Sequence, residues 1–125
     1  MAKPSIEEFA ALLVREVRDE AIENCDMSLS PTANYSIAKR WRIQMKELSP
    51  EEFARAIIPD CVDAVLAQLL RAIDNEELLL SFTTSAGALV DLSKEGRGEM
   101  VGEYFGPEGW RYTLSGQRVN DDFTG

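Results

Sequence analysis

Two aspartates, Asp60 and Asp63, are the residues of this 125-residue chain whose type and spacing come nearest to chemistry. Three residues apart, they lie on one side of a helix, where a carboxylate pair could exchange a proton or hold a divalent cation. Asp121-Asp122 is a second acidic pair, but it lacks the spaced oxygens of a calcium loop. Aspartates in a first helical turn are favoured by the helix dipole alone. We therefore interpret both pairs as structural and predict no metal site.

The chain contains no histidine, which limits the nucleophilic mechanisms that it could use. Without imidazole, Ser-His-Asp and Cys-His mechanisms are excluded. The two cysteines, Cys25 and Cys61, have no Cys-x-x-Cys spacing, and we interpret them as reduced, packed thiols. No catalytic residue and no cofactor are predicted, although a histidine-free enzyme stays open as an alternative.

A basic run lies between residues 37 and 46. It contains four basic residues and no acidic one: Lys39, Arg40, Arg42 and Lys46. On a helix, three of them lie opposite Trp41 and Met45. The run is either a solvated face above a buried tryptophan, a grip for an anionic partner, or a contact with the acidic surface of another copy.

Aromatic residues gather around one turn near the C-terminus: Tyr104, Phe105, Trp110 and Tyr112. Trp, Tyr and Arg dominate interface hot spots, so this cluster could be an exposed anchor. Strand alternation would equally place Trp110 and Tyr112 on one face, packed on the core, with Arg111 on the other. The residues predicted to contact a partner are Trp110, Arg111, Tyr112, Arg118, Arg40 and Trp41. The alternative site is a pocket between the central helix and the sheet, formed by Asp63, Asp74, Arg40 and Arg111.

Helical periodicity predicts the elements of the first part of the chain. Apolar residues recur every three to four positions from Ile6, which predicts a helix from Ser5 to about residue 24 with Ser5 and Glu8 spaced as a capping box. A second helix is expected from Ser30-Pro31 to about residue 47, and a third begins at Ser49-Pro50.

Pro59 should break or kink that third helix, because it lacks the backbone N–H and crowds the preceding turn. The segment that follows, from residue 61 to about residue 75, has the strongest apolar stripe of the chain and is the expected central helix.

The later part of the chain is predicted to form β-strands. Short runs at 78–84, 88–92, 99–105 and 110–114 are rich in β-branched or aromatic residues and are separated by glycine-containing turns. The expected fold is α+β, with three to four N-terminal helices packed on a C-terminal antiparallel β-meander of three to four strands. One domain is expected over 1–125, with a helical half at 1–76, a β half at 77–118 and a polar tail at 119–125.

The net charge of -9 restricts the class of partner. Residues 48–125 carry fourteen acidic and six basic side chains, so most of the negative charge lies there. Such a field repels nucleic acid, and the sequence offers neither a secretory signal nor an apolar membrane span. We expect a cytoplasmic protein whose partner is a basic or neutral protein, or a second copy of itself.

The predicted function is a non-enzymatic protein–protein interaction module, such as an immunity-type inhibitor or a regulatory protein. The alternative is a small-molecule binding protein or a histidine-free enzyme that uses the pocket. In size, acidity and helix-plus-sheet build the chain is similar to the small antidotes that block bacterial toxins. This resemblance concerns only these general features, and it assigns no functional role to any residue.

Overall fold

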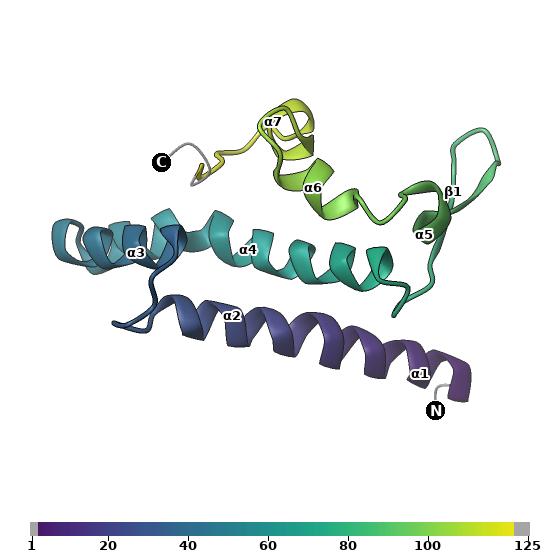
Figure 1. Ribbon diagram of the computed structural model, residues 1–125, viewed down its shortest axis with the longest axis horizontal. Coiled ribbons are helices and arrows are strands. Elements are labelled where there is room, and N and C mark those ends of the chain that lie inside the picture. Colours follow the sequence, from purple (N-terminus) through teal and green to yellow (C-terminus); the bar gives the residue numbers. More distant parts are fainter. Residues whose placement is uncertain (1–2, 122–125) are drawn as a thin grey trace.

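The structure is a computed structural model that describes residues 3–121 (Figure 1). Helices dominate it, and its only sheet within these residues is a two-stranded hairpin. The helical elements are Pro4–Leu12 (α1), Leu13–Asp19 (η1, a π-helix), Glu20–Ser28 (α2), Ser36–Glu47 (α3), Pro50–Asp74 (α4), Leu92–Glu95 (α5), Met100–Phe105 (α6) and Trp110–Leu114 (α7). The strands are Ser81–Thr83 (β1) and Leu89–Asp91 (β2), which pair antiparallel with Phe82 opposite Val90.

The first helix is longer than the sequence predicts, because α1, η1 and α2 form one continuous rod. Its first-turn residue is Pro4, which needs no N–H partner there, and Lys3 is the N-cap. The capping box expected at Ser5 and Glu8 is therefore wrong. The π-helical turns of η1 are wider than α-helical turns, so they shift the direction of the side chains before them relative to those after them.

Of the next two helix starts, the sequence predicts only one. The expected start of α3 at Ser30-Pro31 is wrong, since residues 30–35 form a turn and the helix begins at Ser36. The start of α4 is confirmed: Ser49 Oγ accepts a hydrogen bond from the Glu52 amide, and Glu52 Oε1 accepts one from the Ser49 amide.

Pro59 does not end α4, so the expected helix break is wrong. A proline leaves the carbonyl four residues earlier without its helical partner. Here that carbonyl, Arg55 O, accepts a hydrogen bond of 2.8 Å from Arg118 Nη2, and the next one, Ala56 O, accepts one of 2.9 Å from Asn120 Nδ2. The C-terminal segment thus supplies a donor to the carbonyl that the proline leaves without its helical partner.

The expected α+β fold with a three- to four-stranded meander is wrong. Only the runs at 78–84 and 88–92 contribute strands, while the runs at 99–105 and 110–114 form α6 and α7. Asp74, at the end of α4, accepts hydrogen bonds from the backbone amides of Met100 and Val101 and so caps the start of α6. This long-range cap favours a helix where local β propensity favours a strand.

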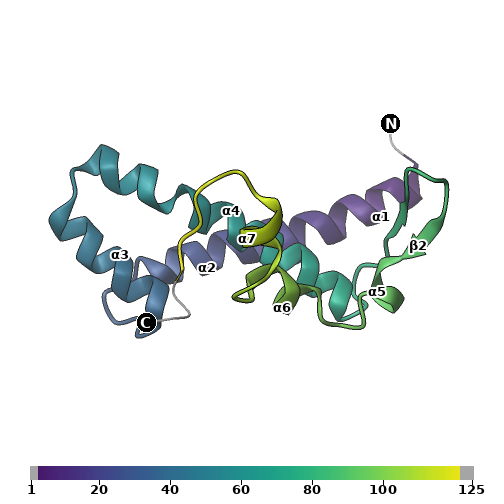
Figure 2. The same ribbon diagram turned by 90° about the horizontal axis from the view of Figure 1, so that it is seen from above.

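The elements are stacked in three layers (Figures 1 and 2). The N-terminal rod runs antiparallel to α4, and α6 and α7 lie on the opposite side of α4, while α3 covers one end and the hairpin projects from the other. Trp41 is the largest fully buried side chain, and it packs edge-on against Phe53 with ring centroids 6.3 Å apart. Among residues 3–121, no helix is both long and apolar enough to cross a bilayer.

Candidate functional site

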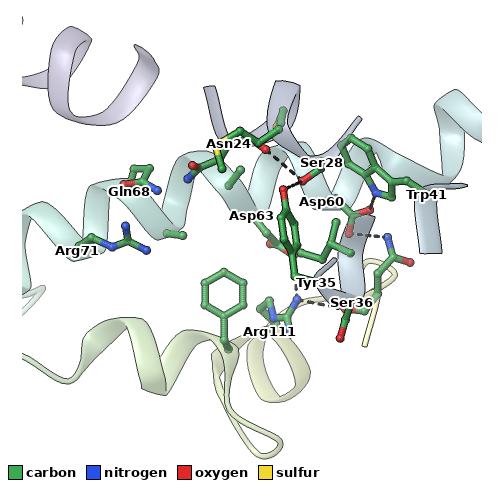
Figure 3. Close-up of a pocket in the computed structure, with 17 residues that line it drawn as sticks. Asn24, Ser28, Tyr35, Ser36, Trp41, Asp60, Asp63, Gln68, Arg71 and Arg111 are labelled. Carbon is green, nitrogen blue, oxygen red and sulfur yellow. Dashed lines mark hydrogen bonds and ion pairs between the residues drawn. The ribbon is translucent and has the colours of Figure 1, made fainter. Parts of the chain in front are cut away.

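A pocket of about 520 Å³ lies where α2, α3 and α4 meet the helices of the C-terminal part (Figure 3). Its volume is within the usual range for small-molecule sites. The wall is largely apolar, with Met27, Ile37, Ala64, Ala67 and Phe105 among the lining residues. Four of its polar residues come from α4, whose pocket side bears two aspartates, a glutamine and an arginine.

Asp60 is the anchor at one end of the pocket. Its Oδ2 accepts a 2.7 Å hydrogen bond from Trp41 Nε1, and its Oδ1 accepts bonds from Arg40 Nη2 at 2.8 Å and Asn120 Nδ2 at 3.1 Å. Each of these donors comes from another part of the chain, so one buried carboxylate ties α3 and the C-terminal segment to α4. Because both oxygens are occupied, Asp60 serves structure here rather than proton transfer.

Asp63, one turn further along α4, holds the other wall. Its Oδ1 accepts a 2.6 Å hydrogen bond from Tyr104 Oη, and its Oδ2 forms an ion pair with Arg111 Nη1 at 2.9 Å. Burial, and then the hydrogen bond to Asp63, raise the pKa of Tyr104 well above its ordinary value. Tyr104 is therefore a neutral donor at physiological pH.

Arg111 enters the pocket wall between aromatic rings. Its guanidinium carbon is 4.8 Å from the ring centroid of Phe105, 5.6 Å from that of Tyr112 and 5.9 Å from that of Tyr104. Such packing stabilises a buried cation in part. It does not replace hydrogen bonds, and two nitrogens of Arg111, Nε and Nη2, are buried without an acceptor among the described residues.

The residues predicted to form a pocket are only partly brought together. Asp63 and Arg111 line it, whereas Arg40 lies behind Asp60 and Asp74 caps α6 at the far end of α4. The opposite wall is helical, because the hairpin lies at the end of the molecule instead of over the central helix.

The residues predicted to contact a partner are not all on the surface. Arg111 and Trp41 are buried, the latter only 1% exposed, and Arg40 and Trp110 are half-buried. Tyr112 and Arg118 are exposed. In the basic run, Arg40 pairs with Asp60 and Arg42 Nη1 donates to Ser30 O, while Lys39 and Lys46 are exposed. Of the second acidic pair, Asp122 lies outside the described residues.

Sequence reasoning missed several polar residues of the pocket, among them Gln68 and Arg71. Gln68 is only 4% exposed and makes no hydrogen bond within the described part of the chain. Its signal was an amide within the apolar run of the central helix, between Ala67 and Leu69. Among residues 3–121 no group of three or more His, Cys, Asp or Glu side chains is arranged to hold a metal ion.

The two cysteines meet across the contact between α2 and α4. Burial raises the pKa of the Cys25 thiol from 9.0 to about 11, and a hydrogen bond with Cys61 adds to the rise. At neutral pH the Cys25 thiol is therefore protonated and a poor nucleophile.

An apolar face lies on the flank of the molecule away from the pocket. On α4, Ile58, Val62 and Val65 share one side by their spacing of four and three residues, and each is between 43% and 53% exposed. Since each residue turns an α-helix by about 100°, this side is directed away from Ala67, which lines the pocket. Ile22, also exposed, lies one turn before Cys25 and so at the level of Val65.

The total exposed surface is large for a chain of this mass. It amounts to 8770 Å², whereas a folded monomer of 13.9 kDa exposes about 6,700 Å². The excess of roughly 2,000 Å² exceeds the roughly 800 Å² that each partner contributes to an interface of standard size. The layered, elongated arrangement therefore leaves a surface on which a partner could be accommodated.

Comparisons with protein-family models, with curated proteins and with solved structures found no match for this chain.

Proposed function

We propose that this protein is a non-enzymatic protein–protein interaction module whose partner at the apolar face is a second copy of the same chain. The apolar face is formed by Ile22, Ile58, Val62 and Val65. The observation that carries the proposal is the exposure of these branched apolar side chains along two packed helices.

A second copy suits this face for two physical reasons. In an isologous dimer, the same patch of each copy contacts its counterpart on the other copy. The apolar face would therefore meet an identical apolar face, which is complementary to it in chemistry. The surplus of exposed surface is also larger than one side of a standard dimer interface requires.

The chemistry of the buried groups supports a non-catalytic role. The chain has no histidine, and each of the two aspartates of the pocket is engaged by an arginine and at least one further donor. A general base needs a lone pair directed at a substrate, and these carboxylates use theirs to hold the fold.

The proposal is tested by measuring mass in solution. Sedimentation equilibrium of the full chain at tens of micromolar should return about 28 kDa, twice the chain mass of 13.9 kDa. The double variant Val62→Gln/Val65→Gln should return the monomer mass, because it places two amides in the apolar face.

A matched control is Leu79→Gln/Leu89→Gln. These leucines are even more exposed, but they lie on and before the projecting hairpin, so the dimer should persist. A wild-type chain that sediments as a monomer at all accessible concentrations would refute self-association. So would a control that dissociates the dimer as completely as the double variant on α4.

A further inference from the structure

One polar side chain of the pocket has a hydrogen-bonding group that the protein itself leaves unused. Gln68 is only 4% exposed and lines the pocket from α4. Its side-chain amide has no hydrogen bond within residues 3–121. Buried polar groups of native proteins are nearly always paired, and an unmatched one is costly. The partners of the Gln68 amide must therefore come from whatever occupies the pocket.

The Gln68 amide can be reached from the pocket. Within the described residues, the side-chain atoms that the protein covers completely and leaves unpaired are Nε and Nη2 of Arg111. The oxygen and the nitrogen of the Gln68 amide also lack a partner but are not among these covered atoms, so both keep accessible surface. Figure 3 shows Gln68 on α4 between Arg71 and Asn24 of α2. A molecule in the cavity can thus contact this amide.

A second unused amide lines the same pocket. Asn24 of α2 is half-buried, and its backbone carbonyl accepts a hydrogen bond from Ser28 Oγ. Its side-chain amide has no partner in the part of the chain that the structure describes. Two neutral groups, each of which can donate and accept, are therefore available to a molecule in the cavity.

The charged groups of the pocket do not call for a charged ligand. Of its two carboxylates, Asp60 pairs with Arg40 and Asp63 pairs with Arg111. The remaining charged residue of the wall, Arg71, is exposed, and water weakens its attraction for an anion. The groups that lack partners inside the cavity are uncharged amides, which suit an uncharged ligand.

The shape of an amide edge indicates the chemistry of that ligand. The carbonyl oxygen of a glutamine and the N–H beside it lie in one plane, so the edge accepts one hydrogen bond and donates another. Glutamine pairs in this way with adenine, which has a donor and an acceptor side by side. A cyclic amide has the same arrangement, because its N–H and C=O are adjacent.

The rest of the wall is largely apolar, and the volume of about 520 Å³ is much larger than one amide group. We infer that this pocket binds a small neutral molecule with an apolar body and one edge on which a donor and an acceptor are adjacent, as in a cyclic amide. Gln68 pairs with that edge, Asn24 supplies a further hydrogen bond, and the apolar body contacts Met27, Ala67 and Phe105. This site is separate from the apolar face and does not depend on the proposed dimer.

Titration of the full chain with 2-quinolone, a bicyclic cyclic amide, tests the inference. In proton–nitrogen correlation spectra the side-chain amide signals of Gln68 should shift saturably, with a dissociation constant below about 1 mM. The N-methyl derivative, which lacks the donor, should bind at least about tenfold more weakly, and so should 2-naphthoate, which has a charge instead of the cyclic amide. Gln68 signals that do not move, or equal affinity for either comparison compound, would overturn the inference.

Gln68→Leu distinguishes a ligand contact from a structural role. It keeps the side-chain size and removes the amide, so 2-quinolone should bind about tenfold more weakly. Without ligand, the midpoint of thermal unfolding should be unchanged or higher, because an amide without a partner does not stabilise the fold. Gln117→Leu, the same change at an exposed position outside the pocket, should leave the affinity unchanged. A lower midpoint together with unaltered affinity would contradict the inference.

Asn24→Ala is an independent test, because alanine is well tolerated in a helix and the side chain makes no hydrogen bond within residues 3–121. It should weaken 2-quinolone binding several-fold. Unaltered affinity in both the Asn24 and the Gln68 variants would refute this site even if 2-quinolone binds elsewhere.

The outcome is distinguishable from that of the proposed function. Val62 and Val65 do not line the pocket, so Val62→Gln/Val65→Gln should bind 2-quinolone as tightly as the wild type. A wild-type chain that is monomeric but binds 2-quinolone through Gln68 would contradict self-association and support the pocket.

Discussion

Asp60 and Asp63 show how two carboxylates can organise a small helical protein. Asp60 collects donors from Trp41, Arg40 and Asn120, and Asp63 collects them from elements near the C-terminus. A buried carboxylate without such donors would be costly, and each donor would be costly without its carboxylate. The two aspartates therefore determine where the other elements sit on α4.

Replacing Asp60 with alanine should destabilise the protein by about 3 kcal/mol, because it leaves the Trp41 indole N–H and the Arg40 guanidinium without their acceptor. Urea unfolding followed by tryptophan fluorescence measures the change. Asp26→Ala, at an exposed position of α2, should change the free energy of unfolding by less than about 0.5 kcal/mol. An equal loss in both variants would contradict the anchoring role of Asp60.

The Cys25 thiol should make stability depend on alkaline pH. Its pKa is about 11 in the folded protein against 9.0 ordinarily, so above pH 9 the thiol ionises more readily in the unfolded chain. Its contribution to stability is complete below pH 9 and is lost as pH rises toward 11. Urea unfolding between pH 8 and 10.5 should show a smaller decrease for Cys25→Ala than for the wild type. Parallel curves would contradict this assignment.

At the scale of elements, the sequence predicts what local contacts determine. Both partners of the Ser49 cap lie within four residues of each other, so the start of α4 could be predicted. The cap of α6 joins Asp74 to an amide 26 residues away, and the donor for Arg55 O comes from Arg118. Such contacts have no local sequence signal, which is why α6 and the uninterrupted α4 were missed.

The same distinction applies to the pocket. Asp63 and Arg111 could be paired in advance, because an acidic residue of the central helix and an arginine in an aromatic cluster are each recognisable. Their common cavity depends on α6 and α7 being helices. A strand at 110–114 would have turned Arg111 and Tyr112 to opposite faces, whereas the helix brings the Tyr112 ring and the Arg111 guanidinium together.

Gly109 should be essential for the junction of α6 and α7. A methyl group there would collide with the backbone carbonyls of Glu103 and Gly106, which cannot move without displacing α6. Gly109→Ala should cost about 2 kcal/mol in the free energy of unfolding. Gly102→Ala, on α6 with open space around it, should be neutral or stabilise by about 0.5–1 kcal/mol. Equal effects of the two substitutions in thermal or urea unfolding would contradict this packing.

At the scale of the whole molecule, two features oppose each other. The layered stack leaves an apolar face exposed, which favours association, while a net charge of -9 on every copy disfavours it. The balance between the two depends on ionic strength, because apolar contact does not weaken with salt whereas repulsion between like-charged surfaces does.

Self-association should therefore strengthen as salt is added. Between 0.01 M and 0.1 M ionic strength the Debye length falls from about 30 Å to about 10 Å, and the dimer dissociation constant should decrease several-fold. Sedimentation at both salt concentrations measures it, with Val62→Gln/Val65→Gln as the control that stays monomeric in each. A dimer that weakens with salt would instead be held by opposite charges, such as Lys39 and Lys46 of α3 against the acidic surface of the other copy. The sign of the salt dependence thus distinguishes an apolar interface from an electrostatic one, whichever residues contribute to it.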